Sequence, residues 1–256
     1  MKHAIIVPGR LASTRFPQKL LHPVLGKPVL LWTAERIRSQ APEFPLYFAV
    51  DSEILRKLLQ DAGFSALMTD PGHSCGTDRI AEANRTLRAE YVINVQGDEP
   101  TVTGEQIRQL AALIQGGAAM ATLGTPLPGE QDYFNPNHVK LVCDQTGHAI
   151  YFSRAPIPYF RDSEGAFEAK AAAHCPVLVH LGLYAYRADF LEAFAAIPVG
   201  RLEAIEKLEM LRVLEHGYRI AVGISKDFLI EIDTLEQALE FQAMVQQPQF
   251  FPDGRE

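Results

Sequence analysis

The sequence predicts an α/β protein with a mostly parallel central sheet and a smaller inserted mixed sheet. In the first half, short apolar runs rich in β-branched residues alternate with segments of helical periodicity. In the middle of the chain, apolar runs follow one another without helices between them. Alternation of strand and helix is typical of a parallel sheet covered by helices, whose ligands bind beyond the carboxyl ends of the strands.

Each element of the first half has its own signal. Four buried parallel strands are predicted from apolar runs that end in polar, Gly or Pro residues, and helices between and after them from apolar residues on one face. The strands are 3–7, 46–50, 91–95 and 118–124, and the helices are 29–39, 53–62, 77–87 and 105–114.

The second half continues with strands of a mixed sheet at 140–144, 145–158 and 180–191. Residues 160–176 have weak patterning and are predicted to form a loop, whose composition permits a lid. The remaining elements are a helix over 201–216 closed by Gly217, a strand over 218–224, and a helix over 235–244. With no internal repeat or low-complexity linker, residues 1–256 are interpreted as one domain.

Composition narrows the classes of function. A formal net charge of −7 argues against a general nucleic-acid or membrane-surface binder, because such proteins present a cationic face. Three widely spaced cysteines without a CxxC motif fit a reducing compartment and do not suggest a zinc site. The chain shows neither a signal-peptide pattern nor an apolar run of bilayer length, so we expect a cytoplasmic protein.

The loop after the first strand, read within IIVPGRLASTRFPQK, carries three cations: Arg10, Arg15 and Lys19. Backbone amides and cations at this position of an α/β sheet can surround phosphate groups. Gly9 allows close approach of the backbone, and Ser13 and Thr14 add hydroxyl donors. A solvated basic turn explains the charge pattern equally well. The spacing matches neither GxxxxGK[ST] nor GxGxxG.

Two acidic residues follow predicted strands and face the same crevice. Asp98 lies in NVQGDEP directly after the strand 91–95, and Asp233 lies in IEIDT where a strand gives way to a helix. Carboxylates at such positions suit Mg²⁺, which bridges phosphate oxygens. Asp98 could instead cap a turn before Pro100, and Asp233 could be a helix N-cap.

Three further features carry weaker signals. Residues 74–79 form a turn into a helix, with donors free for an anion or a base edge, or simply a capped helix. His180 and Tyr184 flank Gly182 on one strand and so face one way, toward a sugar or partly into the core. Glu209 lies on one side of a helix, where acids usually face solvent.

These segments together resemble a known family. PGRLASTRFPQK, LGKPVL, SCGTDRIAEA, VQGDEP, NPNHVK, AIYFSRAPIP, HLGLYAY, LEAIEKLEMLRVLEHG and IDTLEQAL occur in the order seen in the bacterial CMP-Kdo synthetases. These CTP-dependent cytidylyltransferases activate 3-deoxy-D-manno-octulosonate (Kdo) for lipopolysaccharide assembly. The likeness covers nearly the whole chain. It implies a Rossmann-like nucleotide-diphospho-sugar transferase fold, a homodimer, Mg²⁺ as cofactor, and CTP with a 3-deoxy-octulosonic acid as substrates.

The resemblance also implies roles for individual residues. Arg10, Arg15 and Lys19 would hold the CTP phosphates, and Asp98 and Asp233 would bind Mg²⁺, so that these five are the predicted catalytic residues. Further nucleotide contacts are Pro8, Gly9, Ser13, Thr14, Ser74, Gly76, Thr77, Arg79 and Gln96. Sugar contacts are Gln96, His180, Tyr184 and Glu209. Residues 1–130 and 218–246 would form the nucleotide-binding core, and 131–217 the sugar-binding and dimerisation part.

The chain departs from the family pattern at five residues. Gly9 and Gln18 stand where the family usually has alanine and glycine, Cys75 stands for a serine, and Met210 stands for a glutamine. Glu231 replaces a glycine, and an extra carboxylate there could suit the ammonium of the 8-amino-8-deoxy sugar, so Glu231 joins the predicted substrate contacts. Alternatives are a CMP-sialate or CDP-polyol synthetase, or a non-catalytic nucleotide-binding protein on the same fold.

Overall fold

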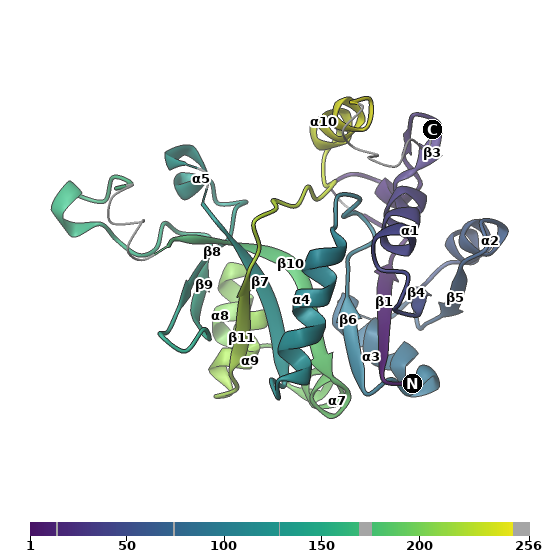
Figure 1. Ribbon diagram of the computed structural model, residues 1–256, viewed down its shortest axis with the longest axis horizontal. Coiled ribbons are helices and arrows are strands. Elements are labelled where there is room, and N and C mark those ends of the chain that lie inside the picture. The colour runs from purple at the N-terminus through teal and green to yellow at the C-terminus, as the bar shows by residue number, and fades with distance from the viewer. Residues whose placement is uncertain (14, 74, 128, 169–175, 248–256) are drawn as a thin grey trace. The chain divides into compact units, whose positions relative to one another are not determined.

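The computed structural model describes residues 1–256 except 14, 74, 128, 169–175 and 248–256. The chain forms two compact units (Figure 1). The first contains residues 1–89, 94–107 and 229–256, and the second contains 90–93 and 108–228. Each unit is described separately. The prediction of one domain, with parts divided near residues 130 and 218, stays a prediction.

The first unit is built on a parallel sheet of β1 (His3–Gly9), β4 (Leu46–Val50) and β5 (Ser65–Met68). Six of the seven residues of β1 are buried, as expected for a strand covered on both faces. The other elements of this unit are η1 (Lys19–Leu21), α1 (Val29–Gln40), α2 (Glu53–Asp61), α3 (Gly76–Leu87), α10 (Leu235–Val245) and a small hairpin of β2 (Pro23–Val24) and β3 (Lys27–Pro28).

The segment before α10 returns to the loop that follows β6. The Ile232 amide donates to the carbonyl of Asp98 over 2.9 Å, and the Ile230 amide donates to the Thr101 hydroxyl over 2.9 Å. An apolar cluster anchors α10 beside α1, with the rings of Trp32 and Phe241 in edge contact at 5.8 Å. Residues far apart in the sequence are thereby held side by side within this unit.

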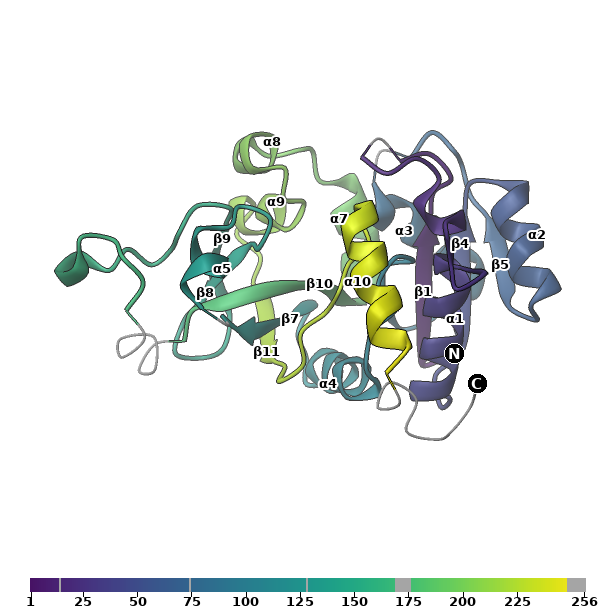
Figure 2. The same ribbon diagram turned by 90° about the horizontal axis from the view of Figure 1, so that it is seen from above.

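The second unit contains the mixed sheet (Figures 1 and 2). Its central strand β7 (Met120–Pro126) is parallel to β11 (Ile220–Ile224) and antiparallel to the long β10 (Leu178–Arg187). β8 (Lys140–Cys143) pairs with β10 and with β9 (Ala149–Ser153). The short helices are α5 (Glu130–Phe134), η2 (Arg161–Ser163) and α7 (Ala188–Ala196). β6 (Tyr91–Asn94) and α4 (Gly104–Gln115) cross from one unit to the other.

The predicted fold class, α/β with a parallel sheet and a mixed sheet, is confirmed. The prediction of one continuous helix over 201–216 is wrong, because the segment forms two helices, α8 (Arg201–Glu206) and α9 (Met210–Glu215). Lys207 adopts a left-handed conformation (φ 56°) that ends α8. The break lets Glu203 and Arg212 form a buried ion pair with two contacts of 2.6 Å, which a continuous helix could not align at this spacing.

Other boundaries also differ. The strand predicted over 180–191 ends at Arg187, where the chain enters α7, and the strand predicted within 145–158 covers only Ala149–Ser153. β5 and the β2–β3 hairpin were not predicted, because their segments are too short to show a period. The predicted loop at 160–176 includes η2, and residues 169–175 of it lie outside the described part of the chain.

Candidate active site

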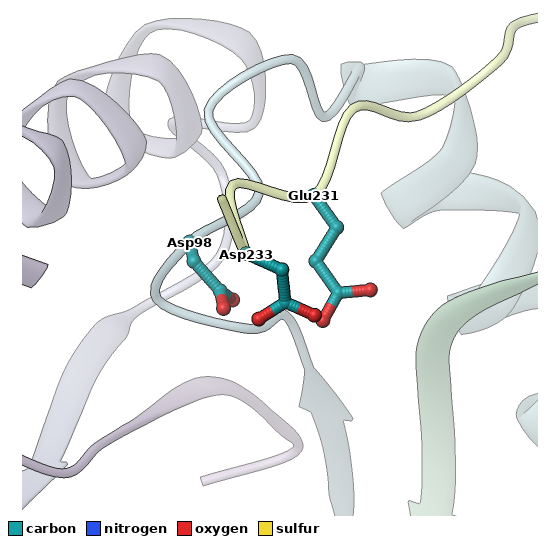
Figure 3. Close-up of side chains that lie close together, drawn as sticks. All are labelled: Asp98, Glu231 and Asp233. Atoms are coloured by element: carbon teal, nitrogen blue, oxygen red, sulfur yellow. The ribbon is translucent and has the colours of Figure 1, made fainter. Parts of the chain in front are cut away.

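Three carboxylates from two segments of the first unit meet at one point. Asp98 lies in the loop after β6, and Glu231 and Asp233 lie just before α10 (Figure 3). One oxygen atom from each of the three lies within 4.8 Å of the others. Asp98 and Asp233 are each only 6% exposed. The hydrogen bond from the Ile232 amide to the Asp98 carbonyl joins the two segments directly, which explains why the three carboxylates lie close together.

Asp233 is not the N-cap of α10. Thr234 caps the helix, with its hydroxyl accepting from the Gln237 amide. The Asp233 carboxylate is instead bound by the Arg15 guanidinium at 2.5 Å and the Lys19 ammonium at 2.5 Å. Lys19 also contacts the Asp98 carboxylate, so its ammonium lies between the two aspartates. The local N-cap interpretation of Asp233 is therefore wrong.

The charges of this cluster shift one another's pKa. Burial by itself would lower the pKa of Lys19, but Asp98 and Asp233 outweigh it and raise that pKa above its ordinary value. Burial would raise the pKa of Asp233, yet Lys19 and Arg15 bring it below the ordinary value. Partial enclosure, and then the charges of Asp98 and Asp233, raise the pKa of Glu231. At neutral pH Lys19 and Asp233 are therefore both charged.

Glu99 supports the loop that carries Asp98. It is 1% exposed, and its Oε2 accepts a hydrogen bond from the Gln96 amide at 3.1 Å. Burial, followed by the charges of Asp98 and Glu231, raises the pKa of Glu99 well above its ordinary value. Its location inside the turn makes Glu99 a residue that shapes the loop.

The three carboxylates offer the ligand chemistry that Mg²⁺ requires. Mg²⁺ takes hard oxygen ligands, usually one or two protein carboxylates with water and phosphate oxygens completing the shell. Asp98 and Asp233 fit this requirement, and Glu231 is near enough to add a third oxygen. Lys19 lies against the same aspartate oxygens, so a metal ion there would compete with the Lys19 ammonium for them.

The loop after β1 is placed beside these carboxylates through Arg15 and Lys19. Arg10 is exposed, and its Nε donates to the carbonyl of Ala12 at 3.0 Å. A Cβ atom at Gly9 would lie 3.1 Å from Val50 Cγ1, so the alanine that the family usually has here would require the Val50 side chain to shift by a few tenths of an ångström. Gln18 adopts a left-handed conformation (φ 55°), which suits the glycine that the family usually has there.

The second predicted nucleotide segment also approaches this loop. A Cβ atom at Gly76 would lie 3.4 Å from the Pro8 ring and 3.8 Å from Gln96 Oε1, so these three residues are neighbours. Thr77 is 4% exposed and Arg79 is 2% exposed. Thr14 and Ser74 lie outside the described residues, and Ser13 lies within the loop. Direct contacts of all these residues with a nucleotide stay predictions.

The predicted sugar-binding residues fall into two groups. Gln96 and Glu231 belong to the first unit, and His180, Tyr184 and Glu209 belong to the second. Along β10, residues 180, 182 and 184 are all partly exposed while their neighbours are buried, which confirms that they face one way. The rings of His180 and Tyr184 are 5.3 Å apart.

His180 is held as a neutral imidazole. Burial lowers its pKa to about 3. Its Nε2 lies 3.1 Å from the Thr122 hydroxyl, and that hydroxyl lies 2.8 Å from the carbonyl of Leu183. If Thr122 donates to Leu183, His180 donates through Nε2, which leaves Nδ1 as the acceptor.

Sequence reasoning missed Asp51, which contacts the loop after β1. The amide of Leu11 donates to Asp51 Oδ1 at 3.0 Å. Asp51 directly follows the strand 46–50. The same signal identified Asp98, namely an acid at the carboxyl end of a parallel strand.

Comparison with known proteins places this architecture among nucleotidyltransferases. The structure is similar to that of a CMP-2-keto-3-deoxy-manno-octonic acid synthetase complexed with CTP, with a TM-score of 0.86 and 31% identity, covering 96% of this chain and 98% of that one. A family model described as cytidylyltransferase matches residues 4–220. The chain belongs to the cytidylyltransferase family.

Two curated relatives carry more specific names. A 3-deoxy-manno-octulosonate cytidylyltransferase of Syntrophobacter fumaroxidans is 45% identical over 90% of this chain and 92% of that protein. An 8-amino-3,8-dideoxy-manno-octulosonate cytidylyltransferase of Shewanella sp. (strain ANA-3) is 41% identical over 92% of this chain and 95% of that protein. The likeness to both covers almost their full lengths.

Proposed function

We propose that this protein transfers CMP from CTP to Kdo, giving CMP-Kdo and pyrophosphate for lipopolysaccharide biosynthesis. Membership of the cytidylyltransferase family supports the use of CTP, and the relative at 45% identity supports the sugar. One structural observation carries the proposal. Lys19 contacts both Asp98 and Asp233, and Arg15 contacts the other oxygen of Asp233, so the cations proposed to bind phosphate and the carboxylates proposed to bind metal form one cluster.

The cations of the loop supply the main electrostatic contribution in this mechanism. The anomeric hydroxyl of the sugar acid gives up its proton to water and its oxygen forms a bond to the α-phosphorus of CTP, while the bond from phosphorus to the bridging oxygen of pyrophosphate breaks. Negative charge grows on the leaving pyrophosphate, where Arg10, Arg15 and Lys19 stabilise it. The raised pKa of Lys19 means that its ammonium is charged at neutral pH before the substrates bind.

Mg²⁺ is part of the proposal. Asp98 and Asp233 would hold it, with Glu231 at the edge of the same cluster. When bound, the ion supplies neutralisation of phosphate charge and favours ionisation of an oxygen bound to it, which removes the need for a strong base in the protein.

Assembly and location complete the proposal. A homodimer in the cytoplasm is proposed from the family resemblance and, for the compartment, from the cysteine pattern. Within the described ranges, the longest apolar helices fall short of what crossing a membrane requires.

The same reaction on the 8-amino sugar is a second candidate, because Glu231 adds a carboxylate to the site and a relative at 41% identity carries that name. The test is pyrophosphate release by purified protein with CTP and Mg²⁺, comparing Kdo with its 8-amino analogue. Turnover that prefers Kdo supports the first candidate, and preference for the amine supports the second. If neither sugar leads to pyrophosphate release, both candidate functions are contradicted. An amine preference that persists in Glu231→Gly would exclude a role for Glu231 in choosing the sugar.

A further inference from the structure

Asp51 lies between the two segments that are expected to bind the nucleotide. It follows β4, the parallel neighbour of β1, and its side chain is only 9% exposed. Its Oδ1 accepts from the Leu11 amide at 3.0 Å, and its own amide donates to the Gly9 carbonyl at 3.3 Å. Both contacts hold the loop that begins at Gly9.

The other oxygen of Asp51 faces Arg79 of α3. The Arg79 guanidinium lies 3.6 Å from Asp51 Oδ2, and its side chain is 2% exposed. Two further hydrogen bonds hold the Arg79 guanidinium in place. Its Nη1 donates to the Thr69 hydroxyl at 2.5 Å and to the Asp70 carbonyl at 3.4 Å. Arg79 belongs to the first turn of α3, so its placement bears on the position of the start of this helix.

We infer that Asp51 is a positioning residue that sets the phosphate-binding loop and the start of α3 in register for CTP. The inference rests on the proposed function, because it assumes that both segments bind the nucleotide. The Asp51 carboxylate accepts a hydrogen bond from a backbone amide of the loop after β1. Its other oxygen faces the buried guanidinium of Arg79 in α3. Without Asp51, the buried Arg79 would lose the largest of its favourable charge interactions and keep only the smaller ones with Glu82 and Asp70, so we expect loss of Asp51 to displace both segments.

The charge balance points the same way. Arg79 lies close enough to Arg10 for the two positive charges to repel, which contributes to lowering the pKa of Arg79 after the larger effect of burial. Asp51 offsets this repulsion. Asp51 thereby favours the charged form of Arg79 inside the protein in spite of the nearby charge of Arg10.

The experiment measures dissociation constants of CTP and of CMP by calorimetry for the wild type, Asp51→Asn and Asp51→Ala, with melting temperatures recorded in parallel. Asp61→Asn is the matched control, since Asp61 also pairs with a cation but lies exposed on α2. Because CMP lacks the two phosphates that the loop is proposed to hold, the ratio of the two constants isolates the positioning of the loop.

We expect Asp51→Ala to weaken CTP binding about tenfold more than CMP binding, as loss of a hydrogen bond and a charge partner near a ligand does. Asp51→Asn keeps an acceptor for Leu11 and should show a smaller loss, of about threefold. If Asp51→Ala does not fold, the isosteric Asp51→Asn decides the test.

An unchanged ratio in variants that bind CTP, even with lower melting temperatures, would overturn the inference and leave Asp51 as a structural residue. Such a result would leave the proposed function intact. Failure of the wild type to bind CTP would overturn the proposed function and this inference together.

Discussion

Two groups of polar side chains, one in each unit, differ in how the fold treats charge. In the first unit, Lys19 and Asp233 are half-buried or buried and stay charged because each compensates the other, and the Asp98 carboxylate also contacts the Lys19 ammonium. In the second unit, His180 is enclosed among aromatic rings without an acidic partner in the contacts described, and burial keeps it neutral. The comparison teaches that burial alone does not decide ionisation, since a partner of opposite charge reverses its effect.

The largest expected effect follows from removing a carboxylate charge from the group in the first unit. Asp98→Asn or Asp233→Asn removes a carboxylate that neutralises Lys19 and is proposed to bind Mg²⁺, so kcat should fall by about 10²–10³-fold. Pyrophosphate release at saturating CTP measures it. Glu240→Gln, an exposed acid on α10, serves as the control and should retain wild-type turnover. Full activity in either aspartate variant would show that the cluster is not catalytic.

The neutral state of His180 should be detectable in the pH dependence of the unfolding free energy. With a pKa of about 3 when folded and about 6.5 when unfolded, His180 takes up a proton more readily in the unfolded chain. Its stabilising contribution is therefore complete above pH 6.5 and is lost as the pH falls toward 3. Between pH 7 and pH 5 this costs about 2 kcal/mol of unfolding free energy.

His180→Gln keeps a donor for the Thr122 hydroxyl but does not titrate. Urea unfolding at pH 7 and pH 5 should show a smaller loss of stability for this variant than for the wild type. Equal losses in the two proteins would mean that His180 is not held neutral by the fold.

The smallest expected effect separates Glu231 from the two aspartates. If Glu231 contributes an oxygen to a bound cation, Glu231→Gly should weaken Mg²⁺ binding by about tenfold. Calorimetry without nucleotide measures this, and Glu231→Gln distinguishes loss of charge from loss of the side chain. Unchanged affinity in both variants would place Glu231 outside the metal shell and return it to the choice of sugar.

Much of the site was predictable because its residues follow strands. In a parallel sheet the carboxyl ends of strands lie at one edge, so Arg15, Lys19 and Asp98 could be expected near one another. Asp233 was harder, because its place before a helix equally predicted an N-cap, and only the structure shows Thr234 in that role. Asp51 carried the same strand-end signal as Asp98 but stood alone in the sequence, without a neighbouring motif.

The sequence by itself determined the α/β class, the order of most elements and the family, because apolar periodicity and ordered motifs are local properties of the chain. Only the tertiary structure decided that helix 201–216 breaks at Lys207, that Glu231 joins the two aspartates, and that Asp51 connects the loop to Arg79. These outcomes depend on contacts between residues distant in sequence. Their energies, from burial and charge pairing, are comparable to or larger than local propensities.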